Sequence, residues 1–228
     1  MFHSIRHAVD STGFAIASLA LASLLLPATY LRGGEITGLT WYSGVASVAG
    51  ETIVAPTEPN NDDHVGTSPN VIYVLQKNYS AIGPVDLVFD VSDTGGGTEY
   101  LFVEGVWNGT GIDWGGYHLE LGFGHGAGFV KATADDGLDF DAPDYNSDFS
   151  FSPWFATVWV SEYDVITSDG LIPTSSYASG LLFHIDVPDG ITSFTLRQSP
   201  IAVPEPSSGM LAALALLAAW FFRRLNQR

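Results

Sequence analysis

Six aspartates crowd into a short segment in the second half of the chain, and carboxylates at this density can bind a hard cation. They are Asp135, Asp136, Asp139, Asp141, Asp144 and Asp148. Such carboxylates repel one another unless water or a cation neutralises them, and Ca²⁺ takes oxygen ligands in flexible loops. The spacing is not that of an EF-hand, because Pro143 interrupts it and no Gly followed by Glu completes it. Two interpretations stand, a calcium-binding loop and a solvated acidic loop, and the composition favours the second.

A second chemistry to weigh is zinc binding, through His118, Glu120, His125 and His184. His118 and Glu120 are two residues apart, so a strand would place them on one face. Both also fit as solvent-facing side chains opposite apolar neighbours, and His184 alternates with apolar residues in the same way. No close ligand spacing is present. The pattern therefore favours ordinary solvent-facing residues over a zinc site.

Motifs of covalent and cofactor chemistry are missing from the sequence. The chain has no cysteine, which excludes a cysteine nucleophile, a disulfide and a thiolate metal site. No Gly-x-Ser-x-Gly elbow occurs, and the glycines of Gly122–Gly128 are not followed by the helix that a dinucleotide site needs. A glycosidase needs a pair of carboxyl groups, and the chain has too many acidic residues for its sequence to single out such a pair. We therefore predict a protein without catalytic residues or a bound cofactor, Ca²⁺ excepted.

Tryptophans offer a further kind of site, because their faces can stack on sugar rings. The candidates are Trp107, Trp114, Trp154 and Trp159. Trp114 follows a Gly-rich turn, so we expect it to be the most exposed of the four and name it as a candidate ligand contact. Most tryptophans in such positions belong to the core instead.

The charge balance limits the partners of the protein. The chain has 25 acidic and 8 basic residues and a formal net charge of −17. Within residues 34–202 the only basic side chains are those of Lys77, Lys131 and Arg197. Such a field disfavours nucleic acid and anionic lipid headgroups, and leaves cations, neutral glycans and other proteins as partners.

Strand-like alternation, punctuated by Gly, Asp and Pro, fills residues 34–202. Asp86–Ser92 and Glu99–Trp107 alternate on either side of Gly95–Gly97, which predicts a hairpin. Further strands are predicted at Thr40–Val48, Val71–Leu75, Tyr117–Phe123, Thr157–Tyr163, Leu181–Val187 and Ser193–Arg197. About eight short strands without a helical period predict one acidic all-β domain, an antiparallel β-sandwich or jelly-roll-like fold.

The N-terminus has the pattern of an export signal. Arg6 and His7 precede an apolar run from Gly13 to Leu26, which helix-breaking Pro27 ends. A basic region followed by an apolar run of this length is typical of a secretory signal peptide. We assign residues 1–33 to it and expect cleavage between Ala28 and Gly34.

The C-terminus, residues 203–228, has three parts in a fixed order. Pro204-Glu205-Pro206 is stiff and extended, because each proline fixes its own φ and disfavours helix in the residue before it. An apolar segment over about 209–222 predicts a short transmembrane helix, at the lower limit of the length that spans a bilayer. Arg223 and Arg224 then form a basic stop that stays cytoplasmic.

This order of parts resembles the PEP-CTERM sorting signal of Gram-negative bacteria. The resemblance covers residues 203–228, with Pro204, Glu205, Pro206, Arg223 and Arg224 as the matching positions. It implies recognition by exosortase, a membrane enzyme that removes the tail on the far side of the membrane. The protein is then expected in the cell envelope, at the cell surface or outside the cell, after transient anchoring in the inner membrane.

Three functions follow from these observations, in order of preference. The first is an exported, exosortase-processed surface or extracellular-matrix protein with a non-catalytic β-sandwich. The second is a carbohydrate-binding, lectin-like module, with calcium as a candidate aid and exopolysaccharide as a candidate partner. The third is a secreted hydrolase.

Overall fold

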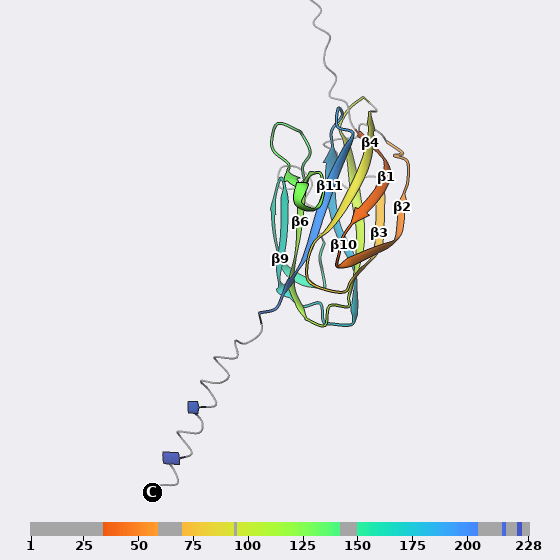
Figure 1. Ribbon diagram of the computed structural model, residues 1–228. Coiled ribbons are helices and arrows are strands. Elements are labelled where there is room, and N and C mark those ends of the chain that lie inside the picture. Colours follow the sequence, from red (N-terminus) through yellow and green to blue (C-terminus); the bar gives the residue numbers. More distant parts are fainter. Residues whose placement is uncertain are drawn as a thin grey trace, which may run out of the picture.

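The structure, a computed structural model, describes residues 34–58, 70–93, 95–141, 150–204, 216–217 and 223–224. Its strands form two β-sheets that pack as a sandwich, which confirms the predicted all-β class (Figure 1). The predicted signal peptide and most of the predicted tail helix lie outside the described residues. Among the residues that are described, no helix is long and apolar enough to cross a membrane.

The larger sheet has seven strands in the order β1-β4-β11-β6-β9-β8, with β7 paired to β6. The strands are β1 (Gly34–Tyr42), β4 (Val85–Asp93), β11 (Ser193–Ala202), β6 (Trp114–Phe123), β9 (Asp164–Gly170), β8 (Phe155–Ser161) and β7 (Val130–Lys131). A single 3₁₀ turn, η1 (Gly126–Gly128), lies between β6 and β7. All neighbouring strands of this sheet are antiparallel.

The smaller sheet has four strands in the order β10-β5-β3-β2. They are β10 (Ser176–Val187), β5 (Thr98–Asn108), β3 (Val71–Tyr79) and β2 (Ala46–Ile53). The strands β3 and β5 run parallel, so the prediction of purely antiparallel pairing is wrong for this pair. Parallel neighbours need a crossover, and here the chain makes it through β4, which belongs to the other sheet.

The predicted hairpin between Asp86–Ser92 and Glu99–Trp107 is also wrong. The first segment is β4, which pairs with β1 and β11, and the second is β5, which pairs with β3 and β10. Alternation of apolar and polar residues shows which face of a strand is buried. It does not show which strand is the partner, because the same face is buried whether two strands pair in a hairpin or belong to two sheets that face each other. The four residues of the connection span about 13 Å when extended, enough to cross between sheets packed about 10 Å apart.

Aromatic rings from both sheets fill the space between them. Phe89 of β4 meets Phe102 of β5 edge to face, with ring centroids 5.4 Å apart. Phe194 stacks on Phe89 at 5.0 Å within the larger sheet, and Phe183 stacks on Phe102 at 5.3 Å within the smaller one. All four side chains are fully buried. Burial of each contributes roughly 1.5–3 kcal/mol, so this cluster is a main source of sheet-to-sheet cohesion.

A buried polar network crosses the same interface. Lys77 on β3 donates from Nζ to Oε2 of Glu104 on β5 at 2.5 Å, and both side chains are fully buried. Gln198 on β11 donates from Nε2 to both oxygens of Glu104, at 2.8 and 2.9 Å. Tyr117 on β6 donates to Gln198 Oε1 at 2.8 Å and is hydrogen-bonded to Tyr79 of β3. Hydrogen bonds from the larger sheet thus complete the coordination of an ion pair in the smaller one.

Burial governs the protonation of this network. It lowers the pKa of Lys77, although the Glu104 carboxylate acts in the opposite direction. Burial also raises the pKa values of Tyr79 and Tyr117. Removing one member of a buried ion pair leaves an uncompensated charge, which costs about 3–5 kcal/mol.

We therefore predict that Lys77→Met lowers the free energy of unfolding by about 3–5 kcal/mol. Glu104→Met should be destabilising as well, because it leaves the buried Lys77 ammonium without its counter-ion. The double variant should lose much less than the sum of the two single losses, since neither charge remains. Chemical denaturation of all four proteins measures the coupling, and strictly additive losses would contradict the pairing.

The burial of the Tyr100 hydroxyl makes the stability of the fold depend on alkaline pH. Its buried hydroxyl accepts a hydrogen bond from the Ile36 N–H at 3.0 Å. Burial raises its pKa to about 12, with the Ile36 bond acting to lower it and Glu35 to raise it. An unfolded tyrosine ionises near pH 10, so between pH 10 and 12 the unfolded state binds fewer protons than the folded state. Stability present below pH 10 is therefore lost as the pH rises through 12.

Tyr100→Phe should lose stability with pH less steeply than the wild type over that window, by up to one proton per molecule. Tyr79, Tyr117 and Lys77 contribute equally to both proteins, so the difference isolates Tyr100. Urea titrations at pH 9.5, 10.5 and 11.5 measure it. Equal slopes for the two proteins would show that Tyr100 ionises normally in the fold.

Candidate binding cleft

A tight turn carries the chain from the larger sheet to the smaller one and forms one side of a cleft. The single strand predicted over Thr40–Val48 is therefore wrong, because β1 ends at Tyr42 and β2 begins at Ala46. Ser43 closes the turn: its Oγ accepts from the N–H groups of Val45 and Ala46 at 3.0 and 2.9 Å and donates to Pro84 O at 3.0 Å. A serine that offers its own hydroxyl to nearby amides favours a turn over a continuous strand.

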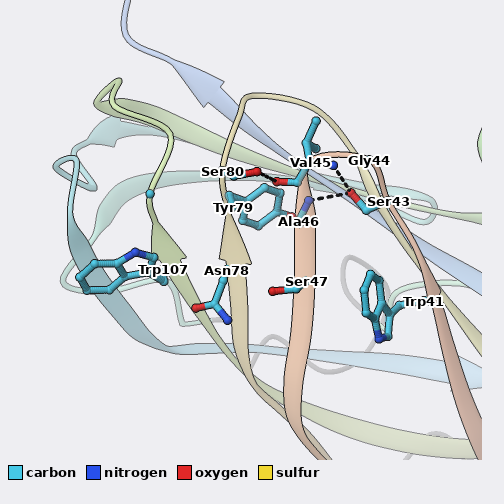
Figure 2. Close-up of a pocket in the computed structure, with 11 residues that line it drawn as sticks. Trp41, Ser43, Gly44, Val45, Ala46, Ser47, Asn78, Tyr79, Ser80 and Trp107 are labelled. Atoms are coloured by element: carbon cyan, nitrogen blue, oxygen red, sulfur yellow. Dashed lines mark hydrogen bonds between the residues drawn. The ribbon is translucent and has the colours of Figure 1, made fainter.

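The cleft beside this turn has a volume of about 470 Å³, within the range of small-molecule sites. It is lined by Trp41, Ser43, Gly44, Val45, Ala46, Ser47, Asn78, Tyr79, Ser80, Trp107 and Gly109. Two tryptophans, Trp41 and Trp107, stand at its two ends and are 37% and 38% exposed. Figure 2 shows Asn78 and Ser47 between them, with their polar ends directed into the space.

Strand register explains why these side chains converge. Ser47 on β2 pairs with Asn78 on β3, which pairs with Trp107 on β5, which pairs with Tyr177 on β10. Register partners form a line perpendicular to the strands, about 4.8 Å apart. The four side chains thus form one row across the outer face of the smaller sheet. Trp41 of β1, in the larger sheet, adds an aromatic ring at the end of the row where Ser47 lies.

Tyr177 extends the aromatic surface beyond the cleft. It is 41% exposed, and its hydroxyl donates to the carbonyl oxygen of Leu75. The ring reaches this acceptor across Gly105, where a Cβ would lie 2.3 Å from both the Leu75 oxygen and the Tyr177 hydroxyl. The sheet therefore needs glycine at position 105 for the tyrosine to lie across it. We call Trp41, Trp107 and Tyr177 the aromatic row.

The lining of the cleft is neutral. Its side chains offer aromatic faces, aliphatic groups, three serine hydroxyls and the amide of Asn78, with no charged group among them. Gln76 donates from Nε2 to Asn78 Oδ1 at 3.1 Å, which orients the amide of Asn78. Flat aromatic rings beside a few fixed hydroxyl and amide groups suit a neutral ligand that carries many hydroxyls.

Most of this site was not predicted from the sequence. Trp107 was among the candidate sugar contacts, but Trp41, Asn78 and Tyr177 were not. The sequence did contain part of this information, because alternate residues of β5 point to opposite faces of the sheet. One face carries Val103, Gly105 and Trp107, and the other carries Phe102, Glu104 and Val106. Glu104 obscured it: a carboxylate on the buried face made the inner and outer sides of β5 hard to distinguish.

The prediction that Trp114 is exposed is wrong. Its side chain is fully buried at the start of β6 and packs edge to face against Tyr79, with ring centroids 5.2 Å apart. Its indole Nε1 donates to Thr110 Oγ1 at 3.1 Å, so burial leaves no donor unpaired. Gly111, with a φ of 77°, shapes the preceding turn, while the Trp114 ring lies in the core. Of the other candidates, Trp159 is 54% exposed on β8, at the edge of the larger sheet.

The acidic segment is only partly described. Asp135 is exposed, and Asp136 accepts hydrogen bonds from the N–H groups of Thr133 and Leu138, at 2.8 and 3.2 Å, which closes a turn. Asp139 forms a β-bridge with Asp186, and Asp141 is buried. Asp144 and Asp148 lie outside the described residues. Calcium binding by this segment stays a prediction.

The candidate zinc ligands separate in the structure. His118 and Glu120 lie together on the outer face of the larger sheet, as predicted, with Asp164 of β9 beside them. His125 stacks on Tyr42 at 3.7 Å. His184 is fully buried with Glu99, which corrects its predicted exposure. A hydrogen-bonding partner 85 residues away in the chain makes that burial tolerable, and no local pattern reveals it.

The sorting residues begin where the fold ends. The strand β11 ends at Ala202, and the N–H of Val203 donates to Asp113 O at 2.9 Å. Pro204 follows, while Glu205 and Pro206 lie outside the described residues. Arg223 and Arg224 are helical and exposed.

Comparison with known proteins identifies this C-terminal segment. Residues 202–225 match the model of the PEP-CTERM protein-sorting motif. The chain therefore carries this motif, which marks it as an exported protein of the cell envelope or surface and a target of exosortase. No curated protein and no solved structure matches the chain.

Proposed function

We propose that this protein is an exosortase-processed surface or extracellular-matrix component whose β-sandwich binds neutral polysaccharide without cleaving it. The observation that carries the binding role is the neutral cleft between Trp41 and Trp107, continued by Tyr177. The sorting motif supports the setting in which such a ligand would be met. The tail serves as a processing signal and as a transient anchor in the inner membrane.

The boundaries of the fold support removal of both ends. The first strand begins at Gly34, after the predicted signal peptide, and the last ends at Ala202, before the prolines of the motif. Cleavage in these two places removes none of the strands in the described part of the chain. The prolines give the segment few amide donors for a sheet and keep it out of helix, which leaves it extended for an enzyme to grip.

The shape of the aromatic row favours a chain-like ligand. From Ser47 on β2 to Tyr177 on β10 the row crosses three strand-to-strand steps, roughly 14 Å at about 4.8 Å per step, which is long enough for several sugar units. Apolar faces of sugar rings pack on the aromatic side chains, while Asn78 and Ser47 exchange hydrogen bonds with hydroxyl groups. Each contact is modest, and several in a row give useful affinity and fix the direction of the polymer.

Binding is favoured over hydrolysis at this site by the chemistry of its lining. A glycosidase needs two carboxyl groups on either side of the scissile bond, and the described lining of the cleft contributes none. The formal charge of −17 also favours a neutral polymer over an anionic one, which the field of the protein would repel.

Affinity electrophoresis of the full chain in detergent, with neutral glucans, mannans and galactans in the gel, tests the binding role. At least one neutral polymer should retard the wild type, and alginate, a polyanion, should not. Trp107→Ala should weaken binding at least about tenfold, as truncation of a central aromatic contact does. Trp41→Ala should act in the same direction.

The matched control is Trp159→Ala, which removes an exposed tryptophan from the other sheet and should leave binding unchanged. The proposal fails if no neutral polymer is bound, or if the Trp41 and Trp107 variants bind as tightly as the control.

A further inference from the structure

Three side chains of the kind that bind transition metals lie together on the outer face of the larger sheet. This face points away from the face of the smaller sheet that carries the aromatic row. The three side chains are those of His118 and Glu120 of β6 and Asp164 of β9. Their nitrogen and oxygen atoms all lie within 4.8 Å of one another, and all three residues are half-buried. We propose that this cluster is a zinc-class divalent metal site, with His118 Nε2, Glu120 and Asp164 Oδ1 as ligands.

Register brings the ligands together. His118 and Glu120 are two residues apart on one strand and share its outward face, since Leu119 and Leu121 point into the core. Asp164 is the register partner of Glu120 on the antiparallel neighbour. Both strands belong to the sheet interior rather than to loops, so the positions of the ligands are set by the fold.

Electrostatics in this face favour an added cation. Glu120 and Asp164 are like charges directly opposite each other, an arrangement that destabilises an antiparallel pair. Glu120 makes no hydrogen bond or ion pair with any described residue. On the other side of β6, the register partner of Glu120 is Arg197 of β11. The Arg197 guanidinium donates from Nε and Nη2 to the carboxylate of Asp86, at 2.6 and 2.9 Å. A metal ion would neutralise the pair.

Lys131 compensates only one of the two carboxylates. Its ammonium contacts Asp164 Oδ2, while Oδ1 of the same carboxylate lies 3.0 Å from His118 Nε2. Lys131 contacts only Oδ2, so Oδ1 can bind the metal whether or not Lys131 is present.

The ligand set decides which metals suit the site. An imidazole nitrogen with two carboxylates favours Zn²⁺ and its neighbours, whereas Ca²⁺ and Mg²⁺ prefer oxygen alone. Tetrahedral zinc with bonds of about 2.0–2.1 Å holds its ligand atoms roughly 3.4 Å apart. The His118–Asp164 separation of 3.0 Å is already near this value, and rotation of the Glu120 side chain supplies the third ligand. Water fills the fourth position.

Metal binding needs an unprotonated nitrogen on His118. Any proton that Nε2 carries before binding is released to solvent, and the lone pair of that nitrogen is then available to the metal. Because only the folded sheet holds the three ligands together, bound metal stabilises the fold in proportion to its free concentration.

The test uses the full chain in detergent, stripped with EDTA and then dialysed free of it, and isothermal titration with ZnCl₂, CaCl₂ and MgCl₂. Zn²⁺ should bind and raise the melting temperature, and Co²⁺ in its place should give visible d–d absorption. His118→Ala and Glu120→Gln should each weaken zinc binding at least about tenfold, in keeping with loss of a ligand. Glu120 makes no hydrogen bond with any described residue, and Arg197 beside it keeps its bonds to Asp86, so the Glu120 variant should keep the fold.

Two variants serve as controls. His125→Ala removes a histidine from elsewhere on the molecule and should bind zinc as the wild type does. Lys131→Met removes a nearby positive charge and should bind at least as tightly. The assignment is overturned if Zn²⁺ does not bind, if the His118 and Glu120 variants bind it as the wild type does, or if Lys131→Met weakens binding more than Glu120→Gln.

Discussion

The ion pair between Lys77 and Glu104 is the constraint on which the rest of the structure depends. A charged pair that is fully buried is tolerable only if its remaining hydrogen-bonding capacity is met, and Gln198 of the opposite sheet meets it with two bonds to Glu104. The pair therefore fixes how the sheets face each other. It also fixes the parallel register of β3 and β5, in which Lys77 lies opposite Val106 and Asn78 opposite Trp107. A slip of β3 by one residue would bury Asn78 and expose Lys77, and would leave Glu104 buried without its partner.

The two outer faces of the sandwich are consequences of that inner arrangement. Asn78 and Trp107 point outward because their neighbours point inward, which gives the smaller sheet its aromatic row. On the larger sheet the same alternation buries Leu119 and Leu121 and leaves His118 and Glu120 outside, next to Asp164. Both faces are complete within residues 34–202, so a sorting motif that begins at the end of β11 can be removed without touching either.

Local patterns predicted the strands well and their partners poorly. The alternation in Asp86–Ser92 and Tyr117–Phe123 correctly identified the buried faces of β4 and β6, but it could not distinguish a hairpin from a crossover between sheets. Trp114 and His184 were misplaced because their burial depends on hydrogen-bond partners rather than on alternation. The cleft was missed for a related reason: its row spans four strands, and register between distant strands is a property of the folded sheets. The sorting motif, being linear, was identified from the sequence, and the family model matches it at residues 202–225.

Export should remove both ends of the chain and leave the sandwich as the mature product. Intact mass spectrometry of the protein from the surface or medium of an exosortase-positive host tests it most directly. The mature polypeptide should start between residues 29 and 35 and end close to Glu205. When exosortase is deleted, or when Pro204 and Pro206 are changed to Ala, the protein should keep its tail and stay in the inner membrane. A surface species that keeps Met1 to Leu26 or still ends in Arg228 would contradict it.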